Sequence, residues 1–67
     1  MSTQFQLPPN LPVRITYLDQ TMKTYRRFVG FGRDGFRFEE ESGDVVVDNR
    51  SYLEISVLTS SGWQKVA

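Results

Sequence analysis

The sequence predicts an all-β domain, arranged as a small, strongly bent antiparallel barrel of five strands. Short apolar segments alternate with polar residues at a period of two, as in Leu53, Ile55 and Val57. Tight polar turns separate these segments, and no stretch shows the period of an amphipathic helix. The 67 residues suffice for one domain. A small open antiparallel sheet that does not close is the alternative topology.

The first predicted strand covers residues 13–18 and follows an N-terminal tail, residues 1–11. Three prolines, at positions 8, 9 and 12, prevent a regular helix in and beside the tail. Phe5 and Leu7 are the tail residues that we consider able to pack onto the domain. In the strand, Val13, Ile15 and Tyr17 alternate with polar neighbours, and Asp-Gln at positions 19 and 20 suits a tight turn.

The second strand is predicted over residues 21–31, with Gly30 marking a bulge or a sharp bend near its end. The Gly-Arg-Asp-Gly sequence at 32–35 is the strongest turn signal in the chain. The third strand follows at 36–40, where Phe36 and Phe38 share one face and are assigned to the core. This turn aligns residue 31 with 36, 29 with 38 and 27 with 40 across the hairpin.

The last two strands are predicted at residues 45–47 and 53–58, joined by a single polar turn. The barrel domain therefore spans residues 12–58, and residues 59–67 are predicted to be a C-terminal tail. Trp63 lies in this tail. It is expected either to cover one end of the barrel or to serve as an anchor in a subunit or partner interface.

The composition excludes several kinds of chemistry. The chain has no Cys and no His, so disulfides, thiolate metal sites and His- or Cys-based nucleophilic catalysis are not available. We expect no enzyme activity, no catalytic residue, no metal and no cofactor. No apolar segment approaches the length of a membrane span and the N-terminus does not resemble a signal peptide, so a cytoplasmic location is expected. Self-association is the remaining way to stabilise so small a core, and a homo-oligomer is expected.

Charge is balanced over the chain but segregated along it. Five basic residues lie between positions 23 and 37, and five acidic residues lie between positions 39 and 48. One interpretation is a basic stripe with interleaved aromatic residues that holds single-stranded nucleic acid. The other is that Arg26 and Arg27 pair with Glu39, Glu40 and Glu41 across the predicted hairpin, which neutralises the stripe within the chain.

The segment from Val45 to Ile55, with sequence VVVDNRSYLEI, resembles the second motif of the Sm-like family, which includes bacterial Hfq. Residues 28–31 with 36–38 loosely resemble the first motif, and the resemblance covers residues 13–58. It implies a strongly bent five-stranded sheet. It also implies homo-oligomeric rings that pair the fourth strand of one subunit with the fifth of the next, and binding of single-stranded RNA.

The resemblance implies two sets of site residues. The RNA-binding candidates lie in the last connection and near the earlier loop: Phe31, Arg33, Asn49 and Arg50. The interface candidates lie on the last two strands: Val45, Val46, Val47, Ile55 and Val57. Trp63 of the tail is added to them, not from the resemblance but as an aromatic anchor.

The sequence therefore leaves two functions open. One is a non-enzymatic Sm-like oligomer that binds single-stranded RNA. The other is an SH3-like protein-interaction or assembly module, such as an accessory or phage-encoded regulator, that binds no nucleic acid. The zero net charge, the pairing of charges within the chain and three aromatic residues expected to be exposed, Tyr17, Tyr25 and Trp63, favour the second function.

Overall fold

A computed structural model of the chain describes residues 7, 8 and 10–67, and within them it contains seven β-strands and no helix. The strands are β1 (Val13–Tyr17), β2 (Met22–Tyr25), β3 (Arg27–Gly32), β4 (Gly35–Glu39), β5 (Val45–Asp48), β6 (Tyr52–Thr59) and β7 (Gly62–Lys65). The all-β prediction is confirmed. The packing expected of Phe5 lies outside the described residues, whereas Leu7 is buried in the core as anticipated.

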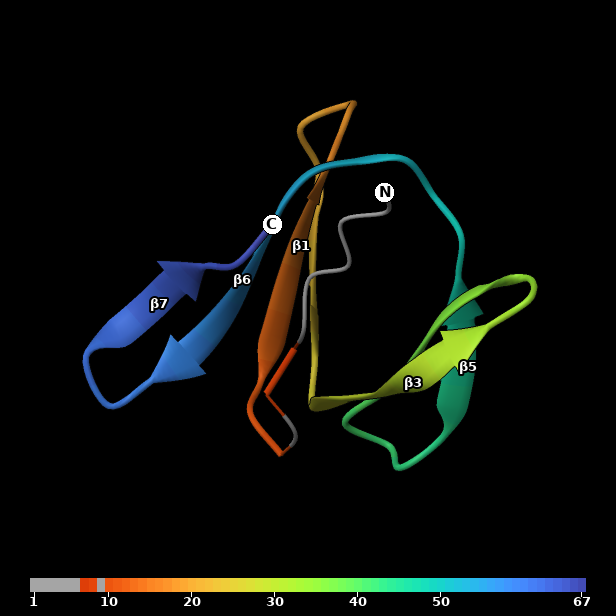
Figure 1. Cartoon of the computed structure of the whole chain (residues 1–67), viewed down its shortest axis with the longest axis horizontal. Coiled ribbons are helices and arrows are strands. Elements are labelled where there is room, and N and C mark those ends of the chain that lie inside the picture. The colour runs from red at the N-terminus through yellow and green to blue at the C-terminus, as the bar shows by residue number, and fades with distance from the viewer. Residues whose placement is uncertain (1–6, 9) are drawn as a thin grey trace, which may run out of the picture.

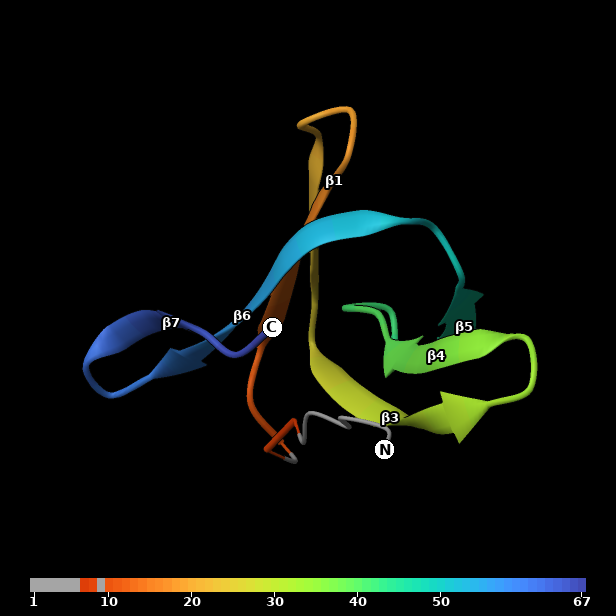
Figure 2. The same cartoon turned by 45° about the horizontal axis from the view of Figure 1, so that its top comes forward.

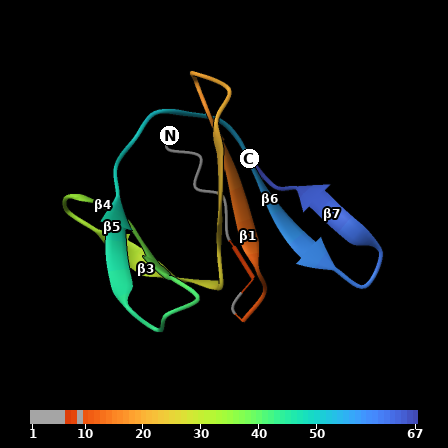
Figure 3. The same ribbon diagram turned by 180° about the vertical axis from the view of Figure 1, so that it is seen from behind.

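The strands form two antiparallel sheets that face one another (Figures 1 and 3). A four-stranded sheet has the order β2-β1-β6-β7, and a three-stranded sheet has the order β3-β4-β5. No ladder of backbone hydrogen bonds joins β5 to the four-stranded sheet within the described residues. The predicted barrel of five strands is therefore not confirmed, because the described residues form two sheets of four and three strands.

The predicted second strand, residues 21–31, is divided at Arg26. Figure 2 shows the chain leaving β2 and turning sharply into β3, so that one extended segment contributes to both sheets. The Arg26 backbone N–H donates to the Glu39 carbonyl at 2.8 Å, which ties this corner to β4. The bulge predicted at Gly30 is present, because the β3–β4 register shifts between Phe28 and Gly30. The bulge and the corner are thus separate features.

The β3–β4 hairpin confirms part of the predicted alignment and corrects the rest. Gly32 pairs with Gly35 and Phe31 with Phe36, so the turn is the predicted one. Beyond the bulge the alignment moves by one residue. Residue 28 instead of 29 now pairs with 38, and residue 27 pairs with 39 instead of 40.

The hydrophobic core lies between the two sheets. The inward residues of β1 (Val13, Ile15 and Tyr17) are all buried, as their alternation predicted. The other buried side chains of the core are Tyr25, Phe38, Ile55 and Val57, with Leu7 from the N-terminal segment. Phe36 is only partly buried but packs against this core, so both predicted core phenylalanines contribute to it.

Residues 59–67 are not a tail. Thr59 ends β6, and Gly62–Lys65 form β7, which pairs with β6 from Ser56 to Thr59. Beyond β7, Val66 and Ala67 exchange backbone hydrogen bonds with Ile55. The edge of β6 opposite β1 is therefore occupied by the chain's own C-terminal segment. The positive φ of Gly62, 103°, permits the tight turn that returns the chain along β6.

Candidate functional site

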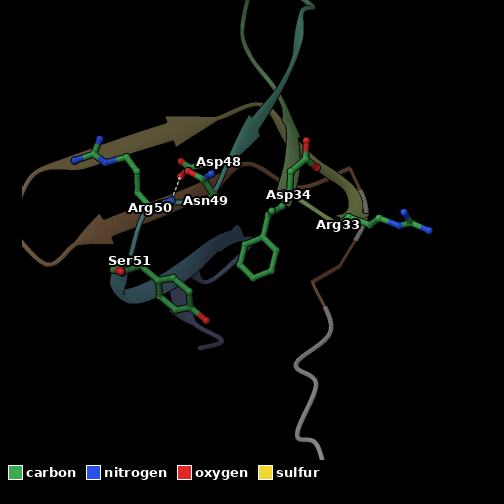
Figure 4. A pocket seen from close by; sticks show the side chains of 9 residues that line it. Arg33, Asp34, Asp48, Asn49, Arg50 and Ser51 are labelled. Carbon is green, nitrogen blue, oxygen red and sulfur yellow. Dashed lines mark hydrogen bonds between the residues drawn. The ribbon is translucent and has the colours of Figure 1, made fainter.

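The β3–β4 turn and the β5–β6 connection enclose an open pocket of about 570 Å³. We call it the loop pocket; residues 33–36 line one side of it and residues 48–52 the other. Figure 4 shows these two segments facing one another across the hollow. Three of the four RNA-binding candidates, Arg33, Asn49 and Arg50, come together here. The fourth, Phe31, lines a neighbouring hollow that shares Arg33 and Asp34 with the loop pocket.

Gly35 sets the close approach of the two loops. Its φ is +138°, and a Cβ at this position would lie 2.8 Å from the Asp48 carbonyl oxygen and 3.0 Å from the Asn49 Cβ. Any other residue would meet backbone as well as an unfavourable conformation. The absence of a side chain at Gly35 therefore lets the hairpin turn lie against the connection after β5.

The walls of the loop pocket are aromatic and its rim is polar. The rings of Phe36 and Tyr52 lie 6.2 Å apart at an angle of 48°, and both side chains are half-buried. Asn49 and Ser51 are exposed on the connection, and Asp34 is exposed on the turn. Such a pocket offers apolar ring faces next to hydrogen-bonding groups.

The two arginines at the loop pocket direct their guanidinium groups away from it. Figure 4 shows the Arg33 side chain extending outward from the turn and the Arg50 side chain extending toward the opposite side. The Arg50 guanidinium lies over the ring of Tyr17, 3.7 Å from the ring centroid, and its Nη2 is 3.5 Å from an Asp19 carboxylate oxygen. Arg50 therefore carries its charge to the β1–β2 turn and away from the hollow.

A buried hydrogen-bonded cluster joins the two sheets beside the loop pocket. Asp48, at the end of β5, accepts hydrogen bonds from the hydroxyls of Tyr17 and Tyr25, the latter at 2.8 Å. Its second carboxylate oxygen accepts from the Arg50 backbone N–H at 3.0 Å. The carboxylate thus links β5 to β1 and β2, strands that share no backbone ladder with it.

The hydrogen bonds of this cluster shift the pKa of each member. Burial works against ionisation of Asp48, but the hydroxyls of Tyr17 and Tyr25 and the Arg50 backbone N–H outweigh it and lower the pKa of the carboxyl group. Burial and the hydrogen bond to Asp48 raise the pKa of Tyr17 to about 12. Burial and the same carboxylate also raise the pKa of Tyr25. An ionised Asp48 with two neutral phenols is the stable combination at neutral pH.

Sequence reasoning missed the Tyr17–Asp48–Tyr25 cluster, although the sequence holds a signal for it. Residues two apart on a strand share a face, so Asp48 lies on the same inward face as Val46. A carboxylate at an inward position needs hydrogen-bond donors from the rest of the core. Tyr17 and Tyr25, both at inward positions of their strands, are donors of that kind. The prediction that these two rings are exposed was therefore wrong, since they are 2% and 3% exposed and belong to the core.

Much of the basic stripe is paired with its own acidic neighbours, as the second interpretation predicted. Arg26 pairs with Glu39 as expected, whereas Arg27 pairs with Glu39 and not with Glu40. Arg27 Nε lies 2.6 Å and Arg26 Nη1 lies 3.5 Å from Glu39 carboxylate oxygens. Lys23 pairs with Glu40 at 2.9 Å. Arg37 reaches Asp34 at 3.5 Å. Much of the positive charge is therefore held in ion pairs along the three-stranded sheet and its border.

The interface candidates fall into three environments. Val45 and Val47 are 55% and 43% exposed on the outer face of β5, and Val46 is half-buried on the inner face. Ile55 and Val57 are 0% and 2% exposed, so their side chains belong to the core and offer no surface to a partner. Ile55 and Val57 occupy inward positions of β6 and face the opposite sheet, so the prediction that they form a subunit interface is corrected.

Trp63, the remaining interface candidate, is half-buried in β7 opposite Leu58. The Arg14 guanidinium lies 4.4 Å from its ring centroid. The indole is thus held on the outer face of the four-stranded sheet by a cation–π contact within the chain.

The described part of the chain contains no group of three or more Asp, Glu, His or Cys residues that could hold a metal ion. No helix in the same part has the length and apolarity to cross a membrane. No protein-family model, curated protein or solved structure shows a significant match to the chain.

Proposed function

We propose that the chain is a non-enzymatic SH3-like binding module that holds a short extended segment of another protein in the loop pocket. One observation carries the proposal: the pocket has aromatic walls and a polar rim, while the guanidinium groups of Arg33 and Arg50 point away from it. Grooves lined by aromatic rings dock proline-rich segments, whose extended conformation costs little entropy to hold.

The side chains of the pocket suggest the chemistry of the ligand. A proline ring fits the faces of Phe36 and Tyr52, while Asn49 and Ser51 can bond to the backbone of an extended peptide. Asp34 adds a carboxylate for a basic ligand residue. Its ion pair with Arg37 is 3.5 Å long and exposed, so a ligand can displace it at small cost.

We also infer that the two sheets make a small barrel of the SH3-like or Sm-like kind that stays open along the free edge of β5. The division of one extended segment between both sheets at Arg26 supports this inference. The return of β6 to β1 supports it as well, because it brings the chain back to the first sheet after the excursion through β3, β4 and β5.

The second candidate is an Sm-like oligomer that binds single-stranded RNA. The gathering of Arg33, Asn49 and Arg50 around one pocket favours it, with Phe31 in the adjoining hollow. Aromatic rings stack on bases and arginines pair with phosphates. The ion pairs along the three-stranded sheet count against it, because they leave little positive charge for a nucleic-acid backbone.

A single titration series separates the two functions. ¹⁵N-labelled protein is titrated with a proline-rich peptide that carries one arginine, then with oligo-U and oligo-A, at low and high salt. The peptide is expected to shift the amide signals of Gly35, Asn49 and Ser51. Asp34→Ala should weaken peptide binding severalfold, whereas Asp44→Ala, which removes an exposed turn carboxylate outside the pocket, should not.

The nucleotide arm decides the alternative. Oligonucleotide binding that falls steeply with salt, with a slope reduced by about one in Arg33→Ala, would establish the RNA function. Shifts from the peptide that spread evenly over both sheets would contradict a site at the loop pocket. A lack of response to all three probes would count against both functions.

A further inference from the structure

β5 is an edge strand with an apolar outer face. In the order β3-β4-β5 only β4 pairs with it, and within the described residues no backbone hydrogen bond reaches its other edge. Val45 and Val47 project from its outer face and are 55% and 43% exposed. An exposed apolar edge of this kind is a template for pairing with another strand.

The other outer edges carry features that oppose such pairing. β3 has the bulge between Phe28 and Gly30, which disrupts a regular ladder. β2 and β7 carry Lys23 and Lys65, and lysine on an edge opposes strand addition. Residues 45–47 of β5 have neither a charge nor a bulge. β5 is therefore the edge that the fold leaves suited to a partner strand.

A second copy of β5 is a self-complementary partner for this edge. Directly opposed residues in an antiparallel pair project to the same face. Val45 of one copy can therefore lie opposite Val47 or Val45 of the other copy, but not opposite Val46. The centred register sets Val46 opposite Val46 of the partner subunit. Each Val45 then faces the partner's Val47, which brings four exposed valines together on one surface.

The charges that flank β5 fit the same antiparallel register. The turn before the strand is acidic, with exposed Glu41 and Asp44. The connection after it carries the exposed Arg50, whose long, exposed ion pair with Asp19 a second carboxylate can share. Antiparallel pairing sets the acidic turn of each copy beside the basic connection of the other. Asp44 falls opposite Asp48 of the partner subunit, whose like charge is turned inward to hydrogen-bond two tyrosines.

The C-terminal segment restricts the association to two copies. A ring through unlike strands requires a second available edge on each subunit, and the corresponding strand here is β6. β7 pairs with β6 along Ser56–Thr59, and Val66 and Ala67 bond to Ile55. A like-with-like contact uses one edge per subunit and closes at a dimer.

We propose that two copies of this chain pair antiparallel through β5, with Val45 opposite Val47 of the partner subunit, to form one continuous six-stranded sheet. The proposal is independent of the ligand of the loop pocket. Four residues from each copy make a small contact, so the dimer is expected to be weak and to depend on concentration.

Sedimentation equilibrium over a wide concentration range is the test. The weight-average mass should rise from 7.8 kDa for one chain toward twice that value and no further. The double variant Val45→Lys/Val47→Lys should weaken dimerisation about tenfold or more, because each altered pair brings like charges together. Val29→Lys is the matched control, since Val29 is 42% exposed on β3 of the same sheet.

A mixing experiment tests the register. The variants Val45→Lys/Val47→Lys and Val45→Glu/Val47→Glu should each be monomeric alone and should form a one-to-one complex when combined. A monomer at every concentration would overturn the proposal, as would a dimer unaffected by the valine changes, a mixture that stays monomeric, or an assembly larger than two. Circular dichroism of each variant shows whether it is folded, and the Glu variant replaces the Lys variant if only the latter unfolds.

Discussion

Asp48→Asn is the most informative single change in the core. The substitution preserves the shape of the side chain but removes the charge that two tyrosine hydroxyls and the Arg50 backbone N–H stabilise. The amide keeps one oxygen acceptor and replaces the other with an NH₂ donor. Both tyrosine hydroxyls donate to one carboxylate oxygen and the Arg50 backbone N–H donates to the other. With the amide oxygen facing the tyrosines, the Arg50 N–H therefore loses its acceptor.

The expected cost follows from the two tyrosine hydrogen bonds. A hydrogen bond to a charged group contributes about 1.5–3 kcal/mol, and one between neutral groups about 0.5–1.5 kcal/mol. Converting both bonds from charged to neutral should lower the free energy of unfolding by about 2–3 kcal/mol. This is a large share of the stability of so short a chain. Urea unfolding followed by Trp63 fluorescence and by circular dichroism measures it.

The pH dependence of unfolding gives a second readout specific to the carboxylate. Because folding lowers the pKa of Asp48, its contribution is full above the pKa of an unfolded aspartate and is lost as pH falls through the folded value. The stability of the native chain should therefore decrease below about pH 4. In Asp48→Asn this part of the acid dependence should be absent.

Asp34→Asn is the matched control for Asp48→Asn, because Asp34 is an exposed carboxylate that makes one long ion pair. It should change the free energy of unfolding by less than about 0.5 kcal/mol. Equal effects of the two substitutions would refute the reasoning. So would an acid dependence that Asp48→Asn leaves unchanged, since the buried carboxylate would then not be its source.

Three further predictions concern other parts of the fold. Gly35→Ala should lower the free energy of unfolding by about 1–3 kcal/mol, measured in urea, because the methyl group meets the backbone of the β5–β6 connection; an unchanged midpoint would contradict the close approach. The stability of the native chain should be complete below pH 10 and should fall as pH rises toward 12, because folding raises the pKa of Tyr17 to about 12; Tyr17→Phe should show a smaller alkaline loss in the same titration. Trp63→Ala should cost about 1–3 kcal/mol in thermal unfolding followed by circular dichroism, because it removes a half-buried ring beside Arg14, and an effect near zero would mean that β7 adds little stability.

The sequence predicted the elements whose signals are local. Alternation placed Val13, Ile15 and Tyr17 on the inner face, and the glycines at 32 and 35 located the hairpin turn. Gly30 correctly indicated a bulge, because a glycine inside an apolar strand has few other uses. The Sm-like resemblance put Arg33, Asn49 and Arg50 into one set, and these three residues line one pocket, although their role in RNA binding stays a prediction.

The features that the sequence did not reveal depend on distant partners. Arg26 has no turn residue beside it; the corner there is set by its backbone bond to Glu39 and by the two sheets that it connects. Gly62–Lys65 has a weak strand pattern, and its pairing with β6 depends on contacts with Leu58 and Arg14. The inward carboxylate of Asp48 could be interpreted only once Tyr17 and Tyr25 were known to face it.

β1 pairs with both β2 and β6, and the three strands of the second sheet lie between β2 and β6 in the sequence. The path leaves the four-stranded sheet at Arg26, builds β3, β4 and β5, and returns at β6 to pair Val57 with Val13. Insertions in the turn at residues 40–44 should leave the pairing of β1 unchanged, since a longer loop costs little free energy. A single deletion inside β1 would shift two ladders at once and reverse the faces of its side chains. Insertions and deletions should therefore be tolerated in the turns of the second sheet but should destabilise the fold in β1.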